Sequence, residues 1–421
     1  MRVALSSYRS KPHSGGQGVY VRNLSRELVA RGHQVQVFSG PPYPELDPGV
    51  GLTRVQSLDL YRHPDRFHHP KWSELHSDVD VLEYLTMCTS GFPEPRTFGV
   101  RLERLLRHRV DEFDILHDNQ TLAPGILRLE RCGLPLLTTI HHPISRDRRL
   151  ELEAAQGWQR LTKRRWYGFV SMQARVARRS AHLLTVSQNS AIDIEQDFKV
   201  SPDRMSVVPV GVDIQTYRPP TLPRVPGRIV TIASADVPLK GLDVLIRALT
   251  AMPASAWSEL YVVGRASDRT GEALAEAGLL DKVAFVHDLS AADLAALIGS
   301  AQVHAIPSLY EGFSLPAVEA MACGTPIVAS RVGALPELVA TDAGLLVPPG
   351  DAMALGHALT EVLADPARRA MMGEAGRARA CSTYSWRAVA QATEGVYERV
   401  VADRRAVTEA SAVGAAKENA A

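Results

Sequence analysis

Cysteine and lysine are both scarce in this sequence, and long apolar runs are missing. The cysteines number four and lie far apart without a CxxC pair, which excludes a disulfide framework and a zinc knuckle of ordinary spacing: Cys88, Cys132, Cys323 and Cys381. We therefore expect a reducing, cytoplasmic setting. No apolar stretch reaches the length of a membrane span, and the chain opens on the strand-like MRVALSS and not on a signal-peptide core.

The sequence also lacks an excess of either charge. Its 47 Lys and Arg against 46 Asp and Glu leave a formal charge of +1, which gives no general argument for nucleic-acid binding. A segment from Pro41 to Arg96 reads as an irregular insert. Its histidines match no compact metal-ligand spacing, so we predict solvated side chains and no metal site there: His63, His68, His69 and His76.

Short β-branched runs alternate with amphipathic stretches along most of the 421 residues. The alternation starts at RVALSS and begins again at RIVTIAS, after the proline-rich stretch Tyr217–Gly227, which we interpret as a linker. The pattern predicts an α/β protein with two doubly wound domains. We place the first at 1–216, completed by a C-terminal helix at about 385–403, and the second at 217–384, with a disordered tail at 404–421.

The stretch YEGFSLPAVEAMACGTP contains several candidate ligand-binding groups. Ser314 suits the N-cap of a short helix and Gly324 its C-terminal end, so the backbone N–H groups near Phe313 and Leu315 can bind an anion. Glu319 lies about one turn further in, where a carboxylate accepts hydrogen bonds from sugar hydroxyls. A nucleotide sugar is the ligand that combines both requirements.

The block EGFSLPAVEAMACGTPIVAS, together with VPVGVD and LKGLDVLIRAL, resembles the retaining glycosyltransferases of family 4, which carry an E-x7-E motif. The resemblance covers nearly the whole chain and implies the GT-B fold, in which two Rossmann-like domains face a central cleft. It also implies a metal-independent, hexosyltransferase-like enzyme of class EC 2.4 that needs no cofactor. Such an enzyme moves a sugar from a nucleotide diphosphate to an acceptor hydroxyl.

The resemblance implies a role for each glutamate and for the start of the helix between them. Glu319 would bind the ribose hydroxyls of the donor, and Glu311 would face the transferred sugar or the phosphates. The backbone amides of Phe313, Ser314 and Leu315 would hold the diphosphate or the sugar. Glu311 is therefore a predicted catalytic residue, and the other four are predicted donor-binding residues.

Lys240, which opens a helix in KGLDVL, matches the family's fixed cation for the diphosphate and is both a catalytic and a donor-binding candidate. The family usually has an arginine five residues earlier, where this chain has Ala235. Either Arg265, at another strand end, supplies the second cation, or the leaving group is stabilised less.

Two further candidates come from the first half of the chain. Gly15 and Gly16 in HSGGQGVYVRNL match the family's glycine loop, which approaches the donor phosphate or the acceptor. His141, at the end of TTIHHP, matches the family's histidine near the reacting sugar and is the third catalytic candidate, with a buried structural histidine as its alternative.

The acceptor is not fixed by the sequence. A saccharide, a lipid-linked glycan of the cell envelope and a small natural product all fit. The basic segment Arg146–Arg179 is either a long solvated helix or a patch that meets anionic lipid at the inner face of the membrane. A nucleotide-sugar epimerase and a non-catalytic nucleotide-sugar-binding protein are the alternative functions.

Overall fold

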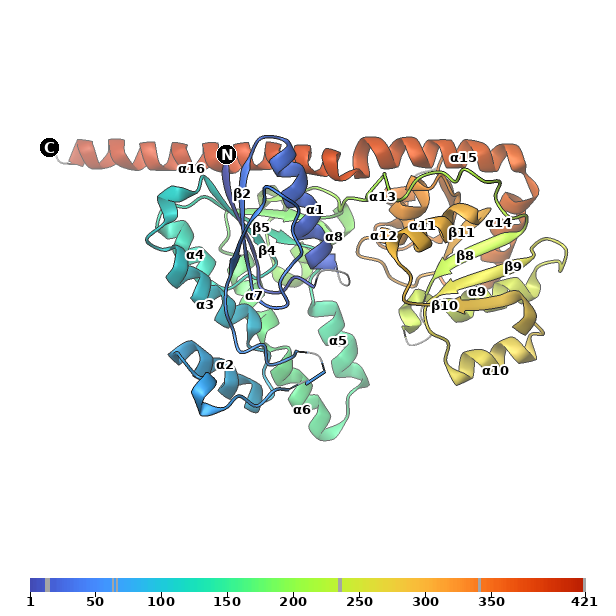
Figure 1. Ribbon diagram of the computed structural model, residues 1–421, viewed down its shortest axis with the longest axis horizontal. Helices are drawn as coiled ribbons and strands as arrows, with labels where there is room; N and C mark the ends of the chain where they lie inside the picture. The colour runs from blue at the N-terminus through green and yellow to red at the C-terminus, as the bar shows by residue number, and fades with distance from the viewer. Residues whose placement is uncertain (12–15, 63, 66, 234–236, 340–341, 419–421) are drawn as a thin grey trace. The chain divides into compact units, whose positions relative to one another are not determined.

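The chain forms two compact α/β units, each built around one sheet (Figure 1). The computed structural model describes residues 1–11, 16–62, 64–65, 67–233, 237–339 and 342–418. The first unit contains Met1–Val186, Ser190–Val208 and the C-terminal segment from Val389; the second contains Ser187–Asn189 and Pro209–Ala388.

The first unit has a seven-stranded sheet in the order β3-β2-β1-β4-β5-β6-β7, in which every neighbouring pair is parallel. The central strands β4 and β5 are buried along their whole length, as expected for a parallel sheet covered on both faces. The strands are β1 (Arg2–Ser7), β2 (Gln34–Ser39), β3 (Gly51–Arg54), β4 (Ile115–Asn119), β5 (Leu136–Ile140), β6 (His182–Thr185) and β7 (Met205–Val207).

Nine α-helices have residues in this unit within the described ranges, with short 3-10 turns at Trp72–Glu74, Val110–Glu112 and Pro202–Arg204. They are α1 (Gly16–Ala30), α2 (Asp78–Cys88), α3 (Glu94–Leu106), α4 (Pro124–Arg131), α5 (Ser145–Ala154), α6 (Gly157–Trp166), α7 (Gly168–Ala177), α8 (Gln188–Phe198) and α16 (Trp386–Glu418).

The second unit has a six-stranded sheet in the order β10-β9-β8-β11-β12-β13, again parallel throughout. Its strands are β8 (Arg228–Ile232), β9 (Glu259–Val263), β10 (Val283–Val286), β11 (Val303–Ile306), β12 (Ile327–Ser330) and β13 (Gly344–Val347). Its helices are α9 (Leu242–Ala251), α10 (Asp268–Glu276), α11 (Ala291–Ser300), α12 (Leu315–Ala322), α13 (Leu335–Val339), α14 (Ala352–Ala364) and α15 (Pro366–Arg379).

Each sheet has a point where the direction of strand addition reverses. In the first unit it lies between β1 and β4, and in the second between β8 and β11. Ligands of open α/β sheets bind beyond the carboxyl ends of the strands at such a point, because the loops on its two sides diverge and leave room. The loops after these four strands are therefore the places to look for a site.

The segment Pro41–Arg96 is more regular than the sequence suggested. It contains the edge strand β3, which pairs with β2, and the helix α2, whose N-cap Ser77 accepts a hydrogen bond from the Asp80 backbone. The sequence did not predict this strand, because GLTR is short and has no alternating pattern. It did not predict the helix, because the first turn of the helix, DVD, is charged.

The proline-rich stretch Tyr217–Gly227 lies inside the second unit and does not connect the units. The chain passes from one unit to the other between Val208 and Pro209. Within the stretch, the Arg224 guanidinium donates to the backbone carbonyls of Gly299, Ala301, Cys323 and Gly324. These bonds fix a segment whose composition alone is typical of a linker.

The basic segment Arg146–Arg179 is not one long helix. It is divided into α5, α6 and α7, with breaks at Ala155–Gln156 and Tyr167. Val170 and Val176 of α7 are buried in the core of the first unit. The last of the three helices is thus a core element and not a solvated surface.

The C-terminal helix α16 continues to Glu418, where the sequence suggested an end at about residue 403 and a disordered tail from 404. In its first-unit part, Tyr397 is fully buried and its hydroxyl lies 2.6 Å from Nδ1 of His117. Arg404, which we placed in the tail, donates to the backbone carbonyl of Glu130. Alanine-rich sequence has high helix propensity, so a helix anchored this way extends beyond its last apolar contact.

Candidate functional site

An ion pair in the second unit joins two predicted catalytic residues. Lys240 Nζ lies 2.6 Å from Oε1 of Glu311, and the same oxygen accepts a hydrogen bond from Ser308 Oγ at 3.0 Å. Glu311 is buried, whereas about a third of the Lys240 side chain is exposed. The carboxylate therefore holds the ammonium group at a surface, with further N–H groups left for a ligand.

The loops after β8, β11 and β12 bring this pair together. Lys240 closes a 3-10 turn, Pro238–Lys240, after β8, and Leu309 after β11 donates its backbone N–H to Leu239. Gly241 has φ 67°, and a Cβ there would lie 2.0 Å from the carbonyl oxygen of Pro307. Only glycine allows the first turn of α9 to approach β11 so closely.

Gly333, in the loop after β12, supports Glu311 from the other side. It has φ 53°, and a Cβ there would lie 1.7 Å from the carbonyl oxygen of Glu311. The next residue, Ala334, donates its backbone N–H to that oxygen at 3.1 Å. The backbone of Glu311 is thus fixed by one hydrogen bond and one close approach.

The helix α12 begins where the sequence indicated. Ser314 is its N-cap residue and Gly324 has φ 63° just beyond its end, as the capping pattern predicts. The Ser314 side chain makes no capping hydrogen bond, and its buried Oγ has no hydrogen-bond partner among the described residues. Leu315 opens the helix and Phe313 precedes it; Pro316 has no N–H, and Ala317 donates its N–H to the Ser314 carbonyl oxygen, so the candidate anion-binding N–H groups are those of Phe313, Ser314 and Leu315.

Glu319 lies on α12 beside Tyr217, which donates its hydroxyl to the carboxylate. Burial raises the pKa of Glu319 to about 7, and the Tyr217 hydrogen bond lowers that pKa by a smaller amount. A carboxyl group with this pKa is part ionised near neutral pH. It accepts hydroxyl donors in its ionised form.

Arg265 follows β9 in the second unit and forms a long ion pair with Asp288, at 3.7 Å. Both side chains are mostly exposed. Gly16 is the first residue of α1, with open space around its Cα. Gly15 and Ala235 lie outside the described residues, so the roles of all four positions stay predictions.

His141 of the first unit follows β5 and is held by two residues at the end of β4. Its Nε2 lies 2.8 Å from Oδ1 of Asn119, and its backbone N–H donates to the side chain of Gln120 at 2.8 Å. The ring of Tyr20 packs edge-on against it, with centroids 4.7 Å apart. Burial lowers the pKa of His141 to about 3, with a smaller contribution from His142, so the imidazole is neutral at physiological pH.

The hydrogen bonds of Asn119 identify the tautomer of His141. Asn119 Nδ2 donates to Ser7 Oγ at 3.4 Å, which leaves Oδ1 as the acceptor facing His141. His141 Nε2 therefore carries the proton, and Nδ1 is the acceptor of the ring.

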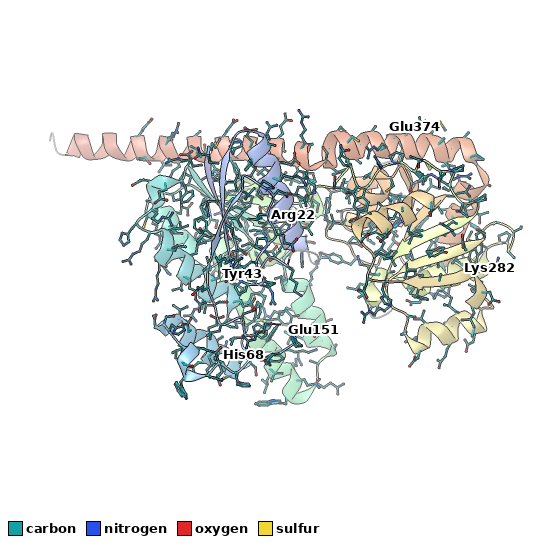
Figure 2. All side chains as sticks on the ribbon, in the orientation of Figure 1. Arg22, Tyr43, His68, Glu151, Lys282 and Glu374 are labelled. Carbon is teal, nitrogen blue, oxygen red and sulfur yellow. The ribbon has the colours of Figure 1, made fainter. Side chains whose placement is uncertain are left out.

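Histidines and carboxylates elsewhere form ordinary ion pairs. In the predicted metal-free insert, His68 lies 2.7 Å from Asp65 and 3.5 Å from Glu74; Figure 2 labels it. Across the described ranges, no group of three His, Cys, Asp or Glu side chains is arranged to hold a metal ion. Within the same ranges, no helix is both long and apolar enough to cross a membrane.

The sequence did not reveal several polar partners of the site. Ser308, Tyr217, Asn119 and Gln120 each contact a predicted site residue. Asn119, the last residue of β4, and Gln120, which follows it, stand in HDNQ, a polar run at a strand end that is a usable signal. Tyr217 gave no signal, because it is far from Glu319 in sequence.

Both halves of the chain match family models. Residues 14–216 match the model described as Glycosyltransferase Family 4, and residues 213–379 match Glycosyl transferases group 1. A relative from Mycolicibacterium hassiacum, named MMP alpha-(1->4)-mannosyltransferase, is 53% identical over 96% of this chain and 99% of its own length. The chain belongs to glycosyltransferase family 4. The resemblance seen in the sequence is confirmed.

Less similar relatives carry a different name. A D-inositol 3-phosphate glycosyltransferase of Xylanimonas cellulosilytica is 31% identical over 96% of this chain and 98% of its own length. Among solved structures, the sucrose-phosphate synthase of Thermosynechococcus elongatus superposes with a TM-score of 0.71 at 24% identity, over 96% of this chain and 99% of that one. The predicted GT-B fold is confirmed, and the chain is a glycosyltransferase.

Proposed function

We propose that this family 4 enzyme is a retaining α-mannosyltransferase that forms α-(1→4) bonds. The donor is a nucleotide-diphosphate mannose and the acceptor is a mannoside. The full-length identity of 53% to a relative named for this linkage carries the proposal. The pairing of Lys240 with Glu311 supports a transferase of this kind, because the buried carboxylate holds a partly exposed cation where a diphosphate could bind.

The donor is held by the second unit. Lys240 and the backbone N–H groups of Phe313, Ser314 and Leu315 at the start of α12 bind the diphosphate, since both present positive charge to an anion. Glu319 accepts the ribose hydroxyls, with Tyr217 orienting its carboxylate. The buried Ser314 hydroxyl, which has no partner among the described residues, supplies one further hydrogen bond to the phosphate.

Transfer proceeds on one face of the sugar. The bond from mannose C1 to the β-phosphate oxygen breaks as the bond from C1 to the acceptor O4 forms, and the acceptor proton passes to the departing phosphate oxygen. Lys240 stabilises the charge that develops on that oxygen. The protein's contribution is positioning and electrostatics, so no metal ion and no other cofactor is required in this scheme.

His141 contributes as a neutral group. Its pKa of about 3 excludes a role as a general acid near neutral pH. The imidazole instead offers a hydrogen bond to the transferred sugar, with its orientation fixed by Asn119. We propose a cytoplasmic location, and contact of the basic α5 and α6 surface with anionic lipid stays a prediction.

The decisive experiment mixes the purified protein with GDP-, UDP-, ADP- and dTDP-mannose and an α-(1→4)-linked mannotetraose. We expect one donor to give a pentasaccharide whose new linkage is α-(1→4) by NMR, and Glu319→Gln to weaken donor binding. A β linkage would exclude the retaining mechanism. Loss of donor without acceptor, or binding without any turnover, would favour an epimerase or a binding protein instead. Transfer of the sugar to D-inositol 3-phosphate, and to no mannoside, would instead favour the activity for which the less similar relatives are named.

A further inference from the structure

The loop between β4 and α4 of the first unit has a strained backbone. Gln120 and Leu122 have positive φ angles, of 57° and 52°, although neither is a glycine. Residues with a long or branched side chain rarely adopt this conformation, because their Cβ comes too close to a backbone carbonyl oxygen. A protein keeps such a loop only where neighbouring groups hold it, and loops of this kind cluster at functional sites.

Two buried side chains hold this loop in its strained form. Oδ2 of Asp118 accepts the backbone N–H of Leu122 at 3.0 Å. Nε2 of Gln173, on α7, donates to the carbonyl oxygens of Gln120 and Thr121, at 3.2 and 3.3 Å. Asp118 is fully buried and Gln173 is only 1% exposed, so water competes little for these hydrogen bonds.

The side chain of Gln120 bonds in turn to the segment that follows β5. Its Oε1 accepts the backbone N–H of His141 at 2.8 Å, and its Nε2 donates to the carbonyl oxygen of His142 at 3.0 Å. Only one orientation of the amide satisfies both partners, because one is a donor and the other an acceptor. Gln120 therefore fixes both ends of the two-residue segment that carries the His141 ring.

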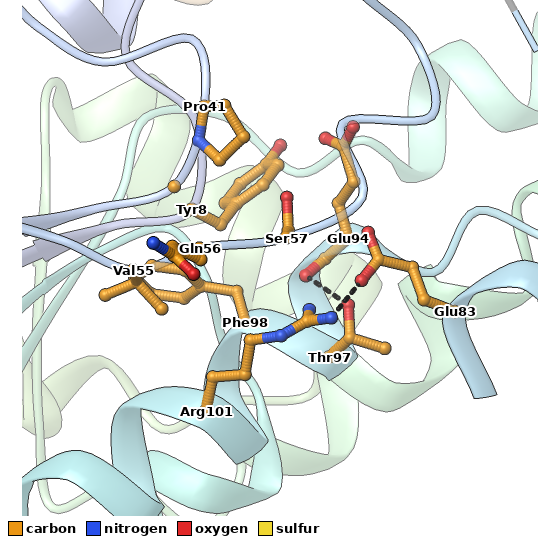
Figure 3. Close-up of a pocket in the computed structure, with 11 residues that line it drawn as sticks. Tyr8, Pro41, Val55, Gln56, Ser57, Glu83, Glu94, Thr97, Phe98 and Arg101 are labelled. Atoms are coloured by element: carbon orange, nitrogen blue, oxygen red, sulfur yellow. Dashed lines mark hydrogen bonds and ion pairs between the residues drawn. The ribbon is translucent and has the colours of Figure 1, made fainter. Parts of the chain in front are cut away.

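Another buried polar cluster of this unit lies after β1, β2 and β3 (Figure 3). There Glu83 lies 2.5 Å from a nitrogen of Arg101. Glu94 lies 3.1 Å from Nη1 of Arg9, and burial raises the pKa of the Glu94 carboxyl to about 8. These groups pair with one another, whereas an amide after β4 bonds to the backbone that carries the candidate catalytic residue His141.

The choice of residue at position 120 points the same way. A glycine would adopt a φ of 57° with less strain than Gln120, but it could not bond to the His141 segment. The strain in this loop is thus the cost of placing an amide against that backbone.

We propose that Gln120, held by Gln173, is a positioning residue for sugar transfer. It fixes the backbone of His141, while Asn119 fixes the rotation of the same ring through Nε2, so the two together set where the imidazole meets the transferred sugar. The inference rests on the proposed function, in which His141 bonds to that sugar. A displacement of about 1 Å at a reacting group can lower a rate about 10²-fold, so the effect should fall on kcat.

The test compares three loop variants of the full chain with one control. Gln120→Gly removes the two side-chain hydrogen bonds and relieves the strain, whereas Gln120→Met removes the bonds and keeps the strain. Gln173→Met removes the support from α7. Gln36→Met is the control, because the half-buried Gln36 of β2 also loses a side-chain hydrogen bond, the one that it donates to Thr53 of β3.

Three quantities are measured for each protein. Transfer to α-(1→4)-mannotetraose, from whichever of GDP-, UDP-, ADP- and dTDP-mannose gives the most product, yields kcat and donor KM. Thermal melts give Tm. The proton on Nε2 of His141 is followed by NMR of the imidazole groups, with its signal assigned by its absence in His141→Gln.

We expect the three loop variants to lower kcat about tenfold with donor KM within threefold of wild type, and to broaden the His141 signal. Gln36→Met should leave all three unchanged. Gln120→Gly should have a higher Tm than Gln120→Met and yet lose as much activity, because activity depends on the side-chain bonds and not on the strain.

A folded Gln120→Gly protein with the kcat of the wild type would overturn the proposal. Losses of kcat that simply follow Tm in all four variants, the control included, would overturn it as well. If the wild type transfers no mannose, the proposed function fails and the NMR signal tests the positioning separately. An unchanged His141 signal in folded loop variants would then overturn the positioning role, and a broadened signal would support it.

Discussion

The two sheets of this protein share one plan but bring different chemistry to their carboxyl ends. At the reversal point of the second unit stands an ion pair, Lys240 with Glu311. At the end of β5, beside the reversal point of the first unit, stands a neutral imidazole, His141, held by an amide, Asn119. The same architecture therefore presents charged side chains in one unit and neutral ones in the other, because the loops and not the sheet set the chemistry.

The largest effect should come from removing the cation of the second unit. We expect Lys240→Met to lower kcat about 10²- to 10³-fold, since in the proposed mechanism Lys240 stabilises the charge on the leaving phosphate. Lys282→Met is the matched control, because Lys282, labelled in Figure 2, precedes β10 at the amino end of the same sheet. Steady-state rates of nucleotide release measure both, and equal losses in the two variants would contradict the assignment.

The next largest effect should be a loss of stability at Gly333, whose backbone supports Glu311. Gly333→Ala should destabilise the protein by about 2–3 kcal/mol, because its Cβ would collide with the carbonyl oxygen of Glu311 at a positive φ. Chemical denaturation measures the change. Gly271→Ala in α10 has open space around it and should be neutral or slightly stabilising. A tolerated Gly333→Ala would show that the Glu311 loop can shift freely.

The pH dependence of donor binding should distinguish Glu319 of the second unit from His141 of the first. In the proposed donor site ionised Glu319 accepts ribose hydroxyls, so we expect donor affinity to rise about tenfold between pH 6 and 8, through its pKa of about 7. His141, with a pKa of about 3, should add no inflection in this range. Calorimetric titrations across the range test this, and Glu319→Gln should flatten the profile. A profile that stays steep in that variant would assign the titration to another group.

The Glu319 carboxyl should also make the stability of the unliganded protein fall, and not rise, with increasing pH. Its pKa in the folded state, about 7, is above the roughly 4.3 of an unfolded glutamate, so the folded state binds the proton more tightly. Its contribution to stability is therefore fully present below about pH 4 and is lost as the pH rises through 7. Glu319→Gln should reduce this loss in thermal melts between pH 5 and 8.

The smallest effect on activity should come from a change beside the neutral His141 in the first unit. Asn119→Ala removes the acceptor that fixes the His141 tautomer, and we expect kcat to fall about fivefold, equivalent to about 1 kcal/mol, with donor KM unchanged. Asn23→Ala on α1 is the control, because the Asn23 amide donates to the backbone carbonyl of Val19 at an exposed position. A change in donor KM without a change in kcat would place His141 outside the reacting region.

The sequence determined the repeating α/β plan, because parallel strands buried on both faces need continuous apolar runs such as those of β4 and β5. It also indicated the ends of α12 and the candidates Glu311, Glu319 and Lys240, since capping and motif chemistry is local. It failed at β3 and α2, whose stability comes from neighbours distant in the chain.

Tertiary structure alone decided which groups meet. Lys240 and Glu311 are 71 positions apart, and Arg9 and Glu94 are 85 apart, so no local pattern predicts that they touch. Burial then fixed the protonation of Glu319, Glu94 and His141, because a pKa depends on the solvent and charges around a group and not on its residue type.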